Sequence, residues 1–146
     1  MNIRVAQRGD EVKIMELIHA LAAYEKAPNE VINTAANLYN DLFEKSICHA
    51  FVAEMDGEIV GFALYYFAYS TWKGQCLYLE DLFVQPTLRQ HGIGKLLFDA
   101  VVSVAKSSNV KRMDWQVLAW NEPALAFYKK QAALLDDEWI NGRLFF

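Results

Sequence analysis

A glycine-rich turn in the second half of the chain has the residue types that bind an anion. It reads Arg89-Gln90-His91-Gly92-Ile93-Gly94 and stands between a predicted strand and a predicted helix. A helix N-terminus offers free N–H groups and a partial positive charge, and glycines let a phosphate approach the backbone closely. Arg89 and Lys95 add cationic side chains beside the turn. The pattern predicts a phosphate or pyrophosphate site.

Two familiar phosphate motifs fit this turn poorly. The dinucleotide-binding fingerprint needs a third glycine and, about 20 residues on, an acidic residue after a strand, which Lys95 and Asp114-Trp115 do not supply. The phosphate loop of nucleotide hydrolases needs Gly-Lys-Ser/Thr, whereas Leu96 follows Gly94-Lys95 here. The structural alternative is that Gly92 only helps the chain to enter the helix.

Glu80 and Asp81 are adjacent carboxylates inside an otherwise apolar predicted strand. A buried charge is costly unless it is paired, so two of them need an explanation. A carboxylate beside a binding site can attract a cation and accept or relay its proton. Strand alternation predicts that the two side chains point to opposite faces, so that at most one faces a given site. The structural alternative pairs each carboxylate with an arginine or lysine.

The elements that must position these residues form an α/β (α+β) pattern. The predicted order is β-α-α-β-β-β-α-β-α-β-β, a mixed, mostly antiparallel sheet flanked by helices within a single domain, residues 1–146. Asp56-Gly57 predicts a hairpin turn, Asn33 or Thr34 a helix start, and Pro123 the first turn of a later helix. The predicted strands cover residues 1–5, 50–54, 58–67, 76–84, 113–118, 134–135 and 143–146, and the last two helices cover about 92–106 and 123–130.

The composition favours an ordinary globular protein. The chain has 146 residues, of which 54% are hydrophobic, and a net charge of -4, which argues against a general nucleic-acid binder. The longest apolar run, residues 59–69, is too short to span a bilayer. Cys48 and Cys76 are isolated and suggest neither a metal site nor a disulfide framework. We therefore expect no metal, no membrane partner and a reducing cytoplasm.

Several strings of residues, in order along the chain, resemble one enzyme superfamily. They are residues 62–67 (Phe-Ala-Leu-Tyr-Tyr-Phe), 77–84 (Leu-Tyr-Leu-Glu-Asp-Leu-Phe-Val), Gly92-Ile93-Gly94, 120–123 (Trp-Asn-Glu-Pro) and 127–129 (Phe-Tyr-Lys). With the predicted order of elements, they resemble the GCN5-related N-acetyltransferase (GNAT) superfamily. More narrowly, the chain looks like the diamine (spermidine/spermine) N-acetyltransferase group, which implies transfer of an acetyl group from acetyl-CoA to an amine.

The resemblance implies a set of acetyl-CoA contacts. The main chain of Leu82, Phe83 and Val84 would pair with the pantetheine arm like an added strand. The turn would hold the pyrophosphate, and Asn121 would hydrogen-bond the pantetheine region. The implied pyrophosphate contacts are the backbone N–H groups of Gln90, His91, Gly92, Ile93, Gly94 and Lys95, and Arg89 is a further candidate for binding the cofactor.

The same resemblance implies the catalytic and acceptor residues. Tyr128, near the sulfur, would be the general acid, and Glu80 the general base through water. Asp81 would shape the amine site, Glu25 would hold a distal ammonium, and Trp72 would cover the acceptor. The alternative for Tyr128 is an aromatic core residue, although its spacing of seven from Asn121 puts both on roughly one helix face.

The acceptor is the open part of this interpretation. Ser70 stands where polyamine-acetylating relatives often have an acidic residue, and Thr71 replaces a proline. The leading hypothesis is a small polyamine, diamine or lysine-like amine. The alternatives are acetylation of a protein N-terminus or lysine, and a non-catalytic acyl-CoA sensor. Relatives commonly form dimers, so we expect a homodimer, with residues 65–67 and 144–146 as interface material.

Overall fold

The computed structural model describes residues 1–146 and contains one five-stranded sheet with the strand order β1-β2-β3-β4-β5. Neighbouring strands are antiparallel except β4 and β5, which are parallel and joined through α3. The elements along the chain are β1 (Asn2–Val5), α1 (Asp10–Tyr24), the 3-10 helix η1 (Pro28–Glu30), α2 (Ala35–Tyr39), the π-helical turn η2 (Asn40–Glu44), β2 (His49–Met55), β3 (Glu58–Ser70), β4 (Gly74–Val84), the 3-10 helix η3 (Pro86–Leu88), α3 (Ile93–Ser107), β5 (Met113–Asp114) and α4 (Glu122–Lys130).

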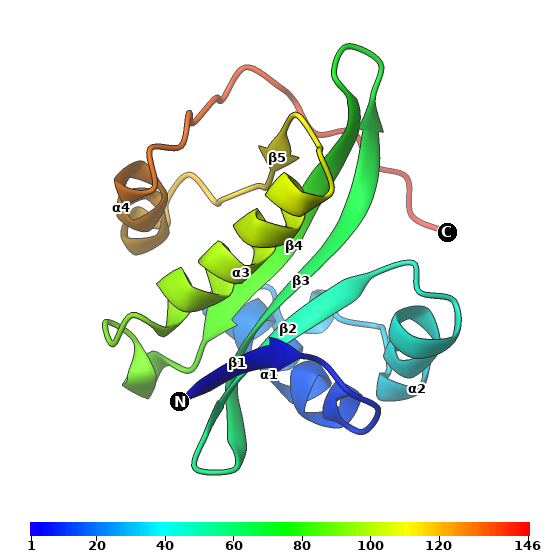
Figure 1. Ribbon diagram of the computed structural model, residues 1–146, viewed down its shortest axis with the longest axis vertical. Helices are drawn as coiled ribbons and strands as arrows, with labels where there is room; N and C mark the ends of the chain where they lie inside the picture. The colour runs from blue at the N-terminus through cyan, green and yellow to red at the C-terminus, as the bar shows by residue number, and fades with distance from the viewer. The chain divides into compact units, whose positions relative to one another are not determined.

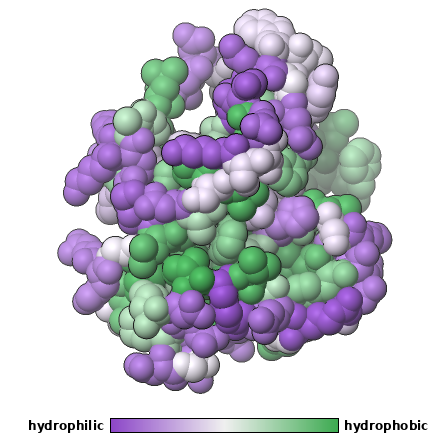
Figure 2. All heavy atoms as spheres, viewed as in Figure 1, coloured by the Kyte–Doolittle hydropathy of each residue, from purple (hydrophilic) through white to green (hydrophobic).

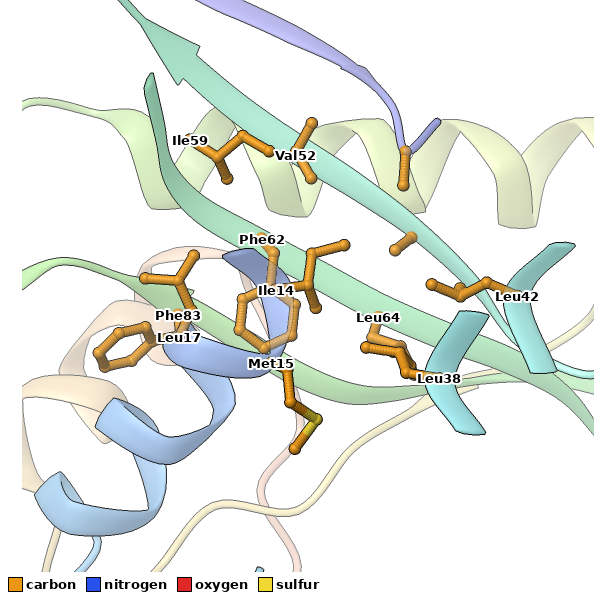
Figure 3. Close-up of a cluster of buried hydrophobic side chains, with 12 residues drawn as sticks. Ile14, Met15, Leu17, Leu38, Leu42, Val52, Ile59, Phe62, Leu64 and Phe83 are labelled. Atoms are coloured by element: carbon orange, nitrogen blue, oxygen red, sulfur yellow. The ribbon is translucent and has the colours of Figure 1, made fainter. Parts of the chain in front are cut away.

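Helices cover both faces of the sheet (Figure 1). α1 and α2 lie on one face, which we call the α1 face, and α3 crosses the other, the α3 face. Figure 3 shows the core of the α1 face, where side chains of α1 such as Ile14 and Leu17 pack against Phe62 of β3 and Phe83 of β4. Ile14 and Phe62 have 0% exposure, as expected for apolar residues repeating at helical and strand periods.

Several turns and helix caps formed where the local sequence predicted them. Asp56 and Gly57 both have positive φ, 51° and 81°, the conformation that a two-residue hairpin turn needs. Thr34 caps α2 by accepting a hydrogen bond from the Asn37 N–H, and Pro123 lies in the first turn of α4. The predicted mixed, mostly antiparallel α/β fold is therefore confirmed.

The predicted strands after α4 are wrong. Residues 134–135 and 143–146 have no strand conformation, and the strand predicted at residues 113–118 is reduced to Met113–Asp114. An apolar or β-branched string indicates only that a strand is possible, because strand conformation is stabilised by pairing with a neighbouring strand. Residues 115–118, 134–135 and 143–146 have no such strand partner.

The chain consists of two compact units, Met1–Trp115 and Gln116–Phe146. The first contains the sheet with α1, α2 and α3, and the second contains α4. A single domain over residues 1–146 stays a prediction. None of the helices is both long enough and apolar enough to cross a membrane.

Candidate active site

Glu80 lies at a β-bulge in β4, which changes the direction of the carboxylates. Leu64 pairs with Asp81 and Tyr65 pairs with Leu79, so Glu80 is the extra residue. Leu64 and Tyr66, two apart on β3, point to the α1 face, and their partners Asp81 and Tyr78 point there too. Glu80, two residues after Tyr78, therefore shares that face with Asp81. The predicted opposite orientation is wrong, because the bulge interrupts strand alternation.

Two carboxylates, Glu80 and Glu25, act on a third, Asp81, on the α1 face. Burial, and then the charges of Glu80 and Glu25, raise the pKa of Asp81 to about 7. Glu25 follows the last residue of α1, and burial raises its pKa as well. None of the ion pairs in the structure includes any of these three residues. The structural alternative, in which Glu80 and Asp81 have cationic partners, is therefore not what the structure contains.

Two tyrosines adjoin these carboxylates. Tyr66 and Tyr78 are cross-strand partners whose ring centres are 5.2 Å apart. Burial, the charge of Glu80 and a hydrogen bond to Glu80 raise the pKa of Tyr66. Burial and then nearby charges, Glu80 first, raise the pKa of Tyr78 to about 12. Sequence reasoning missed both residues, although the alternation of Leu64 and Tyr66 puts Tyr66 on the face of the apolar core.

The glycine turn leads into α3 as the sequence predicts. Gln90 and Gly92 have φ values of 66° and 79°, and α3 begins at Ile93. A Cβ atom on Gly92 would meet nothing within 4 Å, so its backbone conformation, and not crowding, favours glycine there. The first N–H groups of a helix lack intrahelical partners, and residues 90–92 are exposed. The turn therefore presents donors that an anion can reach.

The side chains around the turn already have partners within the protein. The Lys95 ammonium pairs with Asp99 at 2.7 Å, and His91 Nδ1 lies 2.9 Å from the carbonyl oxygen of Arg89. The Arg89 Nε donates a hydrogen bond to the carbonyl oxygen of Val84 at 3.0 Å. Anion binding here would depend mainly on backbone N–H groups and on the helix N-terminus.

The end of β4 has an edge without a strand partner. β5 pairs with β4 only at Leu77 and Tyr78, so Leu82 and Val84 lie beyond the parallel ladder. The Gln85 N–H donates to Val60 of β3, and the backbone direction alternates along a strand. The N–H and C=O groups of Val84 and Leu82 therefore point away from β3. This edge can pair with an extended ligand that carries amides.

Asn121 and Tyr128 both belong to the second unit. Asn121 is the N-cap of α4, and its Oδ1 accepts a hydrogen bond from the Ala124 N–H at 3.3 Å. Tyr128 is 8% exposed, and its ring packs edge-to-face against Phe127 with centroids 5.2 Å apart. The side-chain oxygen of Asn121 thus caps the first turn of α4.

Trp72 and Ser70 lie at the turn between β3 and β4. Trp72 is 88% exposed, so its predicted contact with an acceptor stays a prediction. The Ser70 hydroxyl accepts hydrogen bonds from the N–H groups of Trp72 and Lys73 at 3.2 and 3.1 Å. Ser70 therefore stabilises the turn. The structure contains no group of three or more His, Cys, Asp or Glu side chains that could hold a metal ion.

Comparison with known proteins defines the class of protein. Residues 14–133 match the Acetyltransferase (GNAT) family. The chain belongs to this family, and it is an acetyltransferase. The resemblance inferred from the motifs is thus confirmed.

Individual relatives agree with this assignment. A thialysine N-epsilon-acetyltransferase of Bos taurus is 41% identical over 90% of this chain and 82% of that protein. A human spermidine/spermine N(1)-acetyltransferase-like protein 1 is 34% identical over 90% of this chain and 20% of that protein. Among solved structures, a possible acetyltransferase of Clostridium difficile 630 superposes with a TM-score of 0.84 at 20% identity, covering 99% of this chain and 97% of that one. The last similarity concerns the fold alone.

Proposed function

We propose that this acetyltransferase moves the acetyl group of acetyl-CoA to a primary amine of a small polyamine, diamine or lysine-like substrate. The observation that carries the proposal is the group of three carboxylates without a cationic partner, Glu25, Glu80 and Asp81. Such a group attracts a cationic amine, since an unpaired charge gains from an opposite one. The similarity to a thialysine N-epsilon-acetyltransferase supports the lysine-like member of this substrate class.

The first unit supplies the groups that bind acetyl-CoA in this proposal. The backbone N–H groups of residues 90–95 hold the pyrophosphate at the start of α3. The main chain of Leu82–Val84 pairs with the amides of the pantetheine arm along the free edge of β4. In the second unit, Asn121 forms a hydrogen bond with the pantetheine region.

The reaction is a direct attack of the amine on the thioester. An alkylamine has a pKa of about 10.4, so it arrives protonated and must lose a proton first. Glu80 accepts this proton through water, and Asp81, whose pKa is about 7, holds the amine in place. The nitrogen then forms the C–N bond, the C–S bond breaks, and Tyr128 protonates the leaving thiolate. The second amine proton passes to solvent.

An assay with a panel of amines tests the proposed function. Purified protein is mixed with acetyl-CoA and spermidine, putrescine, lysine, thialysine or a lysine-containing peptide, and thiol release is followed. Turnover on one of the small amines is the expected result. Activity on peptides alone would favour a protein acetyltransferase, and coenzyme A binding without any turnover would favour a sensor. Either outcome would refute the proposal.

The proposed general acid has its own test. Tyr128→Phe removes the hydroxyl and leaves the buried ring, so we expect kcat to fall at least about tenfold while the KM for acetyl-CoA stays within about twofold. Phe127→Leu is the matched control for disturbing the aromatic pair. An unchanged kcat in Tyr128→Phe would remove Tyr128 from the acid role.

The proposal also covers the oligomeric state, the compartment and the partners of the protein. We propose a homodimer that works in the cytoplasm on a small-molecule amine, without nucleic-acid or membrane partners. The two cysteines, Cys48 and Cys76, are free thiols, which is consistent with a reducing compartment. The net charge of -4 suits a cationic substrate better than a nucleic acid.

A further inference from the structure

The side chain of Arg89 is occupied on several sides. Its Nε donates to the Val84 carbonyl oxygen at 3.0 Å. Its guanidinium carbon lies 4.4 Å from the centre of the Tyr24 ring and 5.3 Å from that of Phe83. Arg89 is half-buried at this position. A guanidinium over an aromatic ring gains cation–π energy, and its rigid planar donor fork can hold a carbonyl at the same time.

These partners connect two separate parts of the proposed active site. Arg89 begins the glycine turn, and Val84 ends β4. Tyr24 is the last residue of α1, and the next residue, Glu25, interacts electrostatically with Asp81. Tyr24 therefore contacts the first residue of the anion-binding turn, and Glu25, the next residue, acts on the carboxylate of Asp81.

We propose that Arg89 is a positioning residue and not a phosphate ligand. It holds the glycine turn against the end of α1, and so fixes the acetyl-CoA site relative to the carboxylates that bind the amine. This inference rests on the proposed function, since it assigns both sites. The Arg89–Val84 hydrogen bond also occupies the last outward carbonyl of β4, which leaves the Val84 N–H and the backbone of Leu82 for the pantetheine arm.

A comparison of Arg89 and Tyr24 variants tests the inference by calorimetric binding of coenzyme A to the full chain. Arg89→Lys keeps the charge but loses the planar fork, and Tyr24→Leu loses the ring without touching any charge. We expect each to weaken binding roughly three- to tenfold, as the loss of one cation–π contact implies. Tyr24→Phe keeps the ring and should bind within about twofold of the wild type. Tyr69→Leu, at a 78% exposed tyrosine, is the matched control.

The double variant separates positioning from two independent effects. Tyr24→Leu with Arg89→Lys should bind coenzyme A about as well as the weaker single variant, because both changes break one contact. In turnover assays Arg89→Lys should also raise the KM for the amine, since Glu25 follows Tyr24. Thermal melting verifies that each variant is folded at the assay temperature. If Tyr24→Leu does not fold, the KM for the amine in Arg89→Lys decides, because a side chain that only binds phosphate would leave that KM unchanged.

Two results would overturn the inference. A side chain that only adds positive charge near the phosphate would tolerate Arg89→Lys and be insensitive to Tyr24→Leu, and a bidentate phosphate ligand would also be insensitive to Tyr24→Leu. Wild-type binding in Tyr24→Leu therefore contradicts positioning. Independent, additive losses in the double variant contradict it as well. Calorimetry needs no turnover. A wild type that binds coenzyme A but acetylates nothing would therefore refute the proposed function, and the binding constants of the variants would still test the role of Arg89. A wild type that does not bind coenzyme A would refute both.

Discussion

Asp81 lies on β4 among other carboxylates, and these surroundings set its chemistry. Burial and the charges of Glu80 and Glu25 all disfavour its ionised form, which raises its pKa to about 7. A carboxyl group with a pKa near neutrality can gain or lose a proton under working conditions. When a cationic amine binds, the same group is driven to ionise, so substrate charge and site charge are coupled.

The raised pKa of Asp81 makes a prediction about stability. The folded protein keeps a proton on Asp81 up to about pH 7, while the unfolded chain releases it near pH 3.9. Between these values the folded state binds more protons, so its stability falls as pH rises. Asp81→Asn removes the charge, and we expect its melting temperature to exceed the wild-type value at pH 8 and the gain to shrink at pH 5.

Thermal denaturation from pH 5 to pH 8 measures this difference. Asp137→Asn, at an exposed aspartate, is the control and should follow the wild type at each pH. If the advantage of Asp81→Asn were the same at every pH, Asp81 would not be the group that titrates in this range.

The elements of the first unit meet closely at Gly61 of β3. A Cβ atom there would lie 2.9 Å from the carbonyl oxygen of Phe83, 3.2 Å from Val84 Cγ2 and 3.3 Å from Leu97 Cδ1. The absence of a side chain therefore lets the end of β4 and the first half of α3 approach β3. A glycine inside a strand often marks such a close backbone approach.

Gly61→Ala is predicted to disturb acetyl-CoA binding through these elements. The Phe83 carbonyl belongs to the backbone and cannot rotate away, so β4 must shift. We expect a loss of about 1–3 kcal/mol in unfolding free energy and a several-fold rise in the KM for acetyl-CoA. Denaturant unfolding and steady-state kinetics measure the two effects.

Gly57→Ala is the matched control for this element-scale prediction. Gly57 has a φ of 81° with nothing within 4 Å of an added Cβ, so alanine costs about 1–2 kcal/mol in backbone conformation. The hairpin turn lies outside the proposed site, and the KM for acetyl-CoA should not change. Equal effects of both variants on KM would contradict a specific role for the close approach at Gly61.

The exposed apolar side chains of the whole molecule concentrate near its C-terminus. Leu144, Phe145 and Phe146 are each at least 82% exposed, whereas Tyr65, expected at an interface, is only 8% exposed. Figure 2 shows other apolar areas on the visible face, separated by hydrophilic ones. Contiguous exposed apolar residues often mark an interaction surface. The C-terminal residues are thus better interface candidates than the aromatic run of β3.

The proposed homodimer is the prediction at this scale. Light scattering on the purified chain should give about twice the protomer mass of 16.7 kDa. Replacing Phe145 and Phe146 together with serine should shift the mass toward that of the monomer, because it removes apolar area from the interface. Replacing the exposed Ile32 with serine is the control. A wild type that stays at 16.7 kDa at micromolar concentration would exclude the dimer.

The sequence by itself determined the class of this protein. Its strand and helix periods, the Asp56-Gly57 turn and the helix start at Thr34 depend on neighbours close along the chain, so they could be predicted locally. The glycine turn between a strand and a helix is local in the same sense. Together with the family strings, it was sufficient to indicate an acetyltransferase.

Only the tertiary structure decided how the site residues meet. The β4 bulge at Glu80 depends on pairing with β3, so alternation alone could not reveal that Glu80 and Asp81 share a face. The contact between Arg89 and Tyr24 joins residues far apart in sequence. The strands predicted near the C-terminus did not form because they have no partner strand, and a local string of residues does not reveal whether such a partner exists. These features depend on contacts between distant segments, and such contacts exist only once the chain has folded.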